Sequence, residues 1–229
     1  MTWLVEGEVL HRDSLGITQR IRPGRLNLMT AGRGIAHSEE SPIDRPATLH
    51  GVQLWIALPA AEQYREPSFE HYPELPRIVQ DGWTVTVLAG QAFGMRSPAR
   101  VHTPLIGLDI TSTADAATQI PLDPAFEYGM IALRGSARID AESLAIGTFL
   151  YLGRGRRAIT LATAVPTRLV LLGGVPFGEE IIMWWNFVGR DRAELTRACR
   201  EWNAGQGPFG EVLGYDGPRL QAPLPRYSA

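Results

Sequence analysis

The chain has 229 residues, a hydrophobic fraction of 45%, a charged fraction of 20% and a formal net charge of −2. These values are ordinary for a soluble globular protein, and they exclude a general electrostatic attraction to nucleic acid or to an anionic membrane. All 22 strongly basic residues are arginine, so a mechanism that uses a lysine Schiff base is also excluded.

Short apolar segments separated by turn residues make up the first part of the chain. Their composition and alternation predict β-strands. Turn signals lie between them at Gly7, at residues 13–16 and at residues 23–24. The expected strands here cover residues 3–5, 7–10, 17–21 and 52–56.

Residues 29–39 read Met-Thr-Ala-Gly-Arg-Gly-Ile-Ala-His-Ser-Glu, a glycine turn followed by His37 and Glu39. We expect Gly32 and Gly34 to form a turn with positive φ rather than a phosphate loop, because no P-loop lysine follows. Alternate side chains of a strand point to the same face, so His37 and Glu39 are aimed together. Imidazole nitrogen and carboxylate oxygen are metal ligands. Two ligands rarely hold a transition metal, so the pair predicts half of a metal site.

The rest of the chain continues the pattern of short strands and frequent turns, which is typical of a β-sandwich or barrel. A weak repeat relates residues 4–9 to residues 132–137, and it indicates two similar β-units in tandem. Pro98 and Pro104 place the boundary within residues 97–103. The expected later strands cover residues 83–88, 105–111, 130–133, 137–140, 149–152, 159–162 and 168–172.

One helix is expected near the C-terminus. Asp191 is a suitable N-cap with Glu194 as its capping-box partner, and Gly205 supplies a stop. Cys199 then lies in an apolar stripe with Leu195, so we interpret it as structural rather than reactive. The remaining tail is expected to lie on the protein as an extended arm. Trp184 and Trp185 are interpreted as packing residues, because no basic groove surrounds them.

The sequence contains one cysteine and no apolar run of membrane-spanning length. A single cysteine cannot form an internal disulfide, which fits a reducing compartment. The N-terminus lacks a basic segment followed by an apolar run. We therefore expect a cytoplasmic protein without a membrane or nucleic-acid partner.

Several segments together resemble the pirin family of the cupin superfamily. The most specific is the run from Met29 to Glu39, and the likeness covers almost the whole chain. It implies an all-β bicupin, two jelly-roll barrels in tandem with a C-terminal helix and arm. The implied domains are 1–102, 103–177 and 178–229, the last packing back on the first. The other matching segments are residues 6–16, 23–24, 50–55, 89–94, 171–176 and 184–188.

The same resemblance implies a mononuclear metal site, usually iron, held by three histidines and one glutamate. His37 and Glu39 match the third histidine and the glutamate. The other two belong to a His-x-His element that would fall before Met1, so we expect the first barrel to lack its initial strands through a truncated reading frame. The second barrel contains no histidine and is expected to be structural. The remaining histidines are also interpreted as structural: His11, His50, His71 and His102.

Relatives of this family are associated with quercetin 2,3-dioxygenase activity. The resemblance therefore implies a flavonol-like substrate and dioxygen, with Glu39 as metal ligand and proton acceptor. The alternative is a non-enzymatic, redox-sensing regulatory protein that acts through protein partners. A third alternative is a metal-free relic, since two ligands alone bind a metal weakly.

Overall fold

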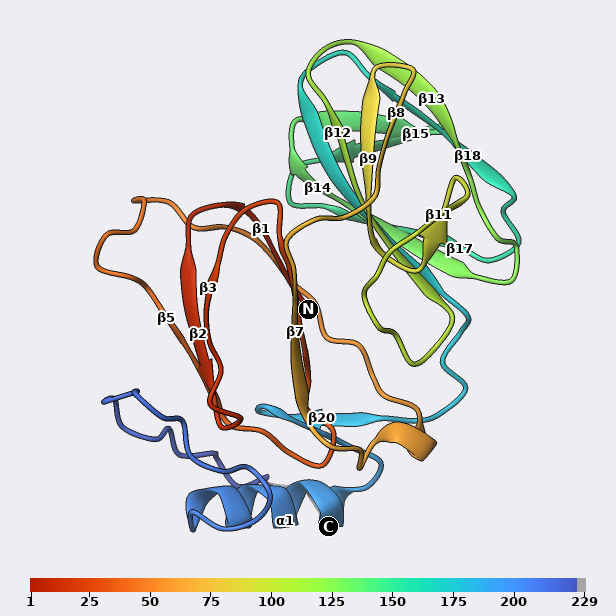
Figure 1. Cartoon of the computed structure of the whole chain (residues 1–229). Coiled ribbons are helices and arrows are strands. Elements are labelled where there is room, and N and C mark those ends of the chain that lie inside the picture. The colour runs from red at the N-terminus through yellow and green to blue at the C-terminus, as the bar shows by residue number, and fades with distance from the viewer. Residues whose placement is uncertain (226–229) are drawn as a thin grey trace. The chain divides into compact units, whose positions relative to one another are not determined.

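In the computed structural model, which describes residues 1–225, the chain forms two compact units (Figure 1). Unit 1 comprises Met1–His71 and the chain from Gly178 onward, and unit 2 comprises Tyr72–Phe177. Each unit contains two larger β-sheets and a two-stranded hairpin, so the predicted all-β class is confirmed. Among residues 1–225, no helix is long and apolar enough to cross a membrane.

Unit 1 is built from a four-stranded sheet and a three-stranded sheet. Leu4, Val9 and Ile21 form a buried apolar cluster that joins the two sheets. The first sheet has the order β6 (His50–Gln53), β1 (Thr2–Glu6), β4 (Leu26–Thr30) and β7 (Ser68–Tyr72), and the second has the order β3 (Thr18–Ile21), β2 (Val9–Asp13) and β5 (His37–Glu40). A short 3-10 helix, η1 (Ala60–Glu62), precedes β7.

Unit 2 contains the larger sheets and the larger apolar core, which includes Trp83, Leu108 and Met130. Its six-stranded sheet has the order β17 (Phe149–Gly153), β14 (Glu127–Arg134), β19 (Thr167–Gly174), β12 (Leu105–Ser112), β9 (Trp83–Ala89) and β8 (Arg77–Gln80). The four-stranded sheet has the order β13 (Ala116–Pro121), β18 (Ala158–Thr163), β15 (Ser136–Ile139) and β16 (Glu142–Ala145), and a hairpin is formed by β10 (Gln91–Ala92) and β11 (Met95–Arg96).

The predicted repeat corresponds to a shared local geometry. Gly7 lies between β1 and β2, and Gly135 lies between β14 and β15, at the point where each unit's chain passes from one sheet to the other. Both glycines have positive φ, 90° and 66°, a conformation that disfavours residues with a Cβ. The prediction of a strand from residue 7 was therefore wrong, and β2 begins at Val9. The predicted strand at residues 52–56 also differs, because β6 ends at Gln53 and Trp55 is exposed.

The division between the units falls at residues 71 and 72, about thirty residues before the boundary predicted within residues 97–103. The reason is strand pairing, because β9 hydrogen-bonds to β8 on one side and to β12 on the other. Pro98 and Pro104 therefore lie in the loop between β11 and β12, inside unit 2, and not in a linker between domains.

The C-terminal part of unit 1 holds a hairpin, β20 (Ile182–Trp184) with β21 (Phe187–Gly189), followed by α1 (Arg192–Asn203). The Asp191 side chain accepts a hydrogen bond from the Glu194 backbone N–H at 2.8 Å, which confirms the predicted N-cap. The predicted capping box is not formed, because the Glu194 carboxylate accepts a hydrogen bond from the backbone N–H of Arg190 rather than from that of Asp191. Leu195 and Cys199 form the buried side of the helix.

The segment after α1 lies against unit 1. Trp184 donates its indole N–H to the Pro223 carbonyl at 2.6 Å, and the Asn203 side chain exchanges two hydrogen bonds with Ala222. The Ala36 N–H donates to the Phe209 carbonyl at 2.8 Å, directly before β5. The tail is therefore fixed beside the strand that carries His37.

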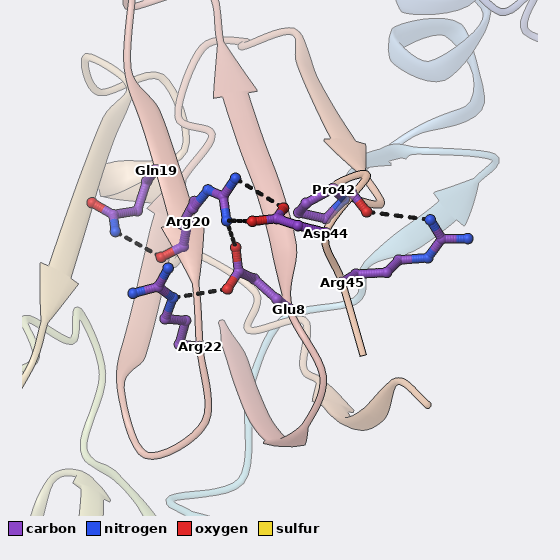
Figure 2. Close-up of polar contacts among 7 residues, drawn as sticks. All are labelled: Glu8, Gln19, Arg20, Arg22, Pro42, Asp44 and Arg45. Carbon is purple, nitrogen blue, oxygen red and sulfur yellow. Dashed lines mark hydrogen bonds and ion pairs between the residues drawn. The ribbon is translucent and has the colours of Figure 1, made fainter. Parts of the chain in front are cut away.

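A surface ion network fixes the loop that leaves β5 (Figure 2). The Arg20 guanidinium donates to Glu8 at 2.6 Å and to both carboxylate oxygens of Asp44, and Arg22 donates to Glu8 at 2.8 Å. The hydrogen bond from Arg20 lowers the pKa of Asp44 below its usual value. Because Arg20, Arg22 and Asp44 are exposed, salt screens the network, and its role is to orient the loop rather than to stabilise the fold.

Candidate metal and active site

Strand β5 brings His37 and Glu39 to one face of the three-stranded sheet. In the antiparallel register with β2, His37 lies opposite Asp13 and Glu39 lies opposite His11. Residues directly opposite each other share a face, and the face of β2 that carries His11 and Asp13 is its buried one. The two predicted ligands therefore point to the inner side of the sheet, while both remain accessible to solvent.

The turn before β5 fixes where that strand starts. Gly32 has a φ of 53°, and a Cβ at this position would lie 2.1 Å from the Arg65 carbonyl oxygen. The Arg33 N–H donates to the same carbonyl at 2.9 Å. The prediction of a positive-φ turn is confirmed, and the close approach of residue 65 shows why no larger residue fits at position 32.

Glu39 is held by a residue of the opposite sheet. The Gln53 side-chain amide nitrogen, on β6, lies 2.9 and 3.0 Å from the two carboxylate oxygens. The same nitrogen lies 3.5 Å from the Thr2 hydroxyl. The Glu39 carboxylate is thus oriented between the two sheets, and it retains solvent-facing lone pairs for another partner.

His37 lies in an environment that favours its neutral form. Although its side chain is exposed at one side, neighbouring groups exclude water from much of the ring, and this desolvation lowers its pKa below the ordinary value of 6.5. The Glu39 and Asp13 carboxylates oppose that shift, whereas His11 adds to it. A neutral imidazole has a free lone pair, which is the form that binds metals.

His11, predicted to be structural, lies directly beside the two predicted ligands. Its ring is 2% exposed, it stacks on His37 with 5.6 Å between the centroids, and its Nε2 lies 3.1 Å from an Asp13 carboxylate oxygen. Sequence reasoning missed His11, Asp13 and Gln53. For His11 and Asp13 the available signal was their alternation in an apolar strand. For Gln53 the sequence held no signal, because Gln53 contacts Glu39 from a strand of the other sheet.

The donor set tests whether a metal fits here. His37 and Glu39 offer the nitrogen and oxygen donors of a non-haem iron site. Within residues 1–225, however, no group of three or more His, Cys, Asp and Glu residues is arranged to hold a metal ion. The described residues thus supply two positions of such a site and do not complete it.

The three histidines other than His11 and His37 are separate from the His37–Glu39 pair. His71, on β7, has its Nδ1 2.7 Å from the side-chain oxygen of Asn27 on β4. His50 lies on β6 opposite Glu6, and His102 lies in unit 2. The structure therefore leaves His37 and Glu39 as the pair that the sequence predicted.

His71 leads to a prediction about acid stability. Desolvation, and secondly the Arg25 cation, lower the pKa of His71 from 6.5, so below this pH the unfolded chain binds a proton more readily than the folded one. The free energy of unfolding should be fully retained above pH 6.5 and should fall as the pH decreases below it. We expect a shallower decline in His71→Gln, measured by urea denaturation between about pH 7.5 and pH 5. Equal declines in the two proteins would contradict this assignment.

Known protein families match segments of both units. The family model described as "Pirin" matches residues 1–56, and the one described as "Pirin C-terminal cupin domain" matches residues 107–208. A Pseudomonas aeruginosa protein named "Putative quercetin 2,3-dioxygenase PA1205" is 48% identical over 97% of this chain and 70% of its own length. A "Pirin-like protein" of Caulobacter vibrioides is 33% identical over 90% of this chain and 72% of its own length.

A solved structure gives the same result for the fold. The crystal structure titled quercetin 2,3-dioxygenase from Acinetobacter baumannii superposes with a TM-score of 0.96 and 43% sequence identity. That superposition covers 100% of this chain and 76% of the other. The two units thus have the arrangement of strands found in that protein.

Proposed function

Because this chain belongs to the pirin family of bicupins, we propose that it acts as a metal-dependent dioxygenase of the quercetin 2,3-dioxygenase type. Its substrates would be a flavonol-like aromatic compound and dioxygen, and its compartment the cytoplasm. The proposal is supported by the names of the Pseudomonas and Acinetobacter proteins, at 48% and 43% identity. The observation that carries it is the placement of His37 and Glu39 side by side on one accessible face.

In this proposal His37 and Glu39 are ligands of one mononuclear metal ion, which we propose to be iron. An iron ion with open positions supplies the chemistry that brings an aromatic oxygen and dioxygen together. Residues 1–225 contain no third His, Cys, Asp or Glu grouped with this pair to hold the ion.

Glu39 would act as the proton acceptor for the substrate. A flavonol must lose the proton of the hydroxyl group on its central ring before that ring reacts with oxygen, and a carboxylate within hydrogen-bond reach accepts such a proton. The Gln53 amide, 2.9 and 3.0 Å from the two carboxylate oxygens, fixes the direction in which Glu39 faces. His37 would use its ring lone pair to hold the metal ion, so it would not compete with Glu39 for this proton.

Flavonol absorbance, together with dioxygen uptake, tests this function. The protein is supplied with ferrous iron and a flavonol. We expect loss of the flavonol band with one dioxygen consumed per flavonol, and loss of that activity in His37→Ala. His102→Ala in unit 2 serves as the control and should retain it. A metal-loaded protein that leaves the flavonol untouched would refute the enzymatic function for this substrate.

A further inference from the structure

The buried face of β2 carries a histidine that the proposed mechanism does not use. His11 is 2% exposed and stacks with two other rings, Phe69 of β7 and His37 of β5. The centroid distances are 4.4 Å to Phe69 and 5.6 Å to His37, and the interplanar angles are 19° and 24°. Three nearly parallel rings therefore span from one sheet of unit 1 to the other.

The central ring of this stack is fixed by a buried carboxylate. Asp13 is 0% exposed, and one of its oxygens lies 3.1 Å from the His11 Nε2. The other oxygen accepts the backbone N–H groups of Leu15 and Ile17 at 2.9 and 3.1 Å. Because a carboxylate only accepts, the His11 Nε2 carries the proton and donates it. The hairpin turn thus holds Asp13, and Asp13 holds the plane of the His11 ring.

Among residues 1–225, no side chain anchors the His37 ring by a hydrogen bond in the way that Asp13 anchors His11. It is the first residue of β5, and it is more exposed than either ring of the His11–Phe69 pair. Offset stacking at centroid distances of 4.5–7 Å is a favoured arrangement for aromatic rings. The stack on His11 is therefore the contact that restricts rotation of the His37 ring about its side-chain bonds.

We propose that His11 is a positioning residue that, braced by Asp13 and Phe69, holds the His37 imidazole in one orientation toward Glu39. Its consequence for catalysis rests on the proposed function of the His37–Glu39 pair. The positioning itself is a property of the folded chain without any ligand. A histidine ring that is already held in its binding orientation loses less conformational freedom when it binds a metal ion. The stack would therefore raise kcat of the proposed reaction.

Nuclear magnetic resonance of the histidine rings tests the positioning independently of activity. The chain has five histidines, so long-range ¹H–¹⁵N spectra of the rings are tractable, and His37→Ala assigns the His37 signals. In the wild type we expect His37 ring protons displaced from free-histidine positions by the neighbouring rings, with a single set of signals. In His11→Gln, which removes the ring, we expect them to move to values typical of a freely rotating histidine.

Two further variants separate stacking from hydrogen bonding and from loss of folding. His11→Phe with Asp13→Asn keeps an aromatic ring and avoids an unpaired buried charge, so it should restore the displaced His37 signals. His50→Gln, outside the stack, should leave them unchanged. Circular dichroism identifies the variants that fold. Wild-type His37 signals in folded His11→Gln would overturn the proposal, and so would failure of the folded double variant to restore them.

The effect on catalysis is read separately. We expect folded His11→Gln to lower kcat for flavonol cleavage by about tenfold, with the double variant recovering most of it. A protein without flavonol activity in any form would refute the proposed function, while the resonance measurement would still decide whether His11 positions His37.

Discussion

Replacing Glu39 with glutamine is expected to lower kcat for flavonol cleavage by about 100-fold or more, without unfolding the protein. The amide cannot accept the proton of the substrate hydroxyl, and general-base catalysis by a positioned group typically contributes about 10²- to 10⁴-fold. Glu39 is exposed, so its replacement leaves no buried charge unpaired. Steady-state kinetics of the iron-reconstituted protein, with kcat expressed per bound iron ion, provide the measurement.

The neighbouring residue provides a matched control for this variant. Glu40 lies on the same strand but on its other face, where it accepts hydrogen bonds from Arg12 at 3.2 Å and from Ser38 at 2.9 Å. Glu40→Gln makes the same chemical change at the adjacent position and should keep kcat within about twofold of the wild type, since it loses only a partly exposed ion pair. Equal losses of activity in the two variants would show that strand β5, rather than the Glu39 carboxylate, is required.

The largest expected effect on stability concerns an ion pair in unit 2 whose carboxylate is buried. Arg168 of β19 donates two hydrogen bonds to the Asp109 carboxylate of β12, at 2.7 and 2.8 Å, and the Asp109 side chain is 4% exposed. Asp109→Ala leaves the Arg168 cation without its partner, so we expect the free energy of unfolding to fall by about 3 kcal/mol. Urea denaturation followed by circular dichroism measures the change.

A double variant separates the cost of the unpaired charge from the value of the pair. Asp109→Leu with Arg168→Met replaces both partners by apolar side chains of similar size, and its stability should lie within about 1 kcal/mol of the wild type. Glu66→Ala removes one partner of the exposed Arg33–Glu66 pair and should cost less than about 1 kcal/mol. If the double variant is as unstable as Asp109→Ala, packing around Asp109 is responsible instead.

Continuous apolar composition identifies the central strands of unit 2. Strands β9 and β12 are buried along most of their length and β19 along half of its length, and all three were predicted, because a run of apolar residues identifies a central strand. Strand β13, which is Ala-Ala-Thr-Gln-Ile-Pro, was missed because small residues and a proline give little strand signal. The local sequence pattern also does not show which distant segments pair, such as β9 with β12. The domain boundary was misplaced for that reason.

The candidate site was predictable where its residues lie close together in sequence. His37 and Glu39 occur two residues apart after a glycine turn, and the alternation of a strand is enough to put them on one face. Gln53 and Phe69 reach the site only through the folding of other strands, and no local pattern distinguishes them. Their roles as supports of the pair depend on tertiary structure.

Metal content is the most direct test of the central claim that His37 and Glu39 bind one metal ion. Elemental analysis by inductively coupled plasma mass spectrometry should be carried out on the purified protein, after reconstitution with ferrous iron and removal of free metal. The account predicts about one metal ion per chain in the wild type and in Glu40→Gln, with at least about tenfold less in His37→Ala and in Glu39→Gln. Metal content near zero in the wild type, or equal content in all four proteins, would contradict it.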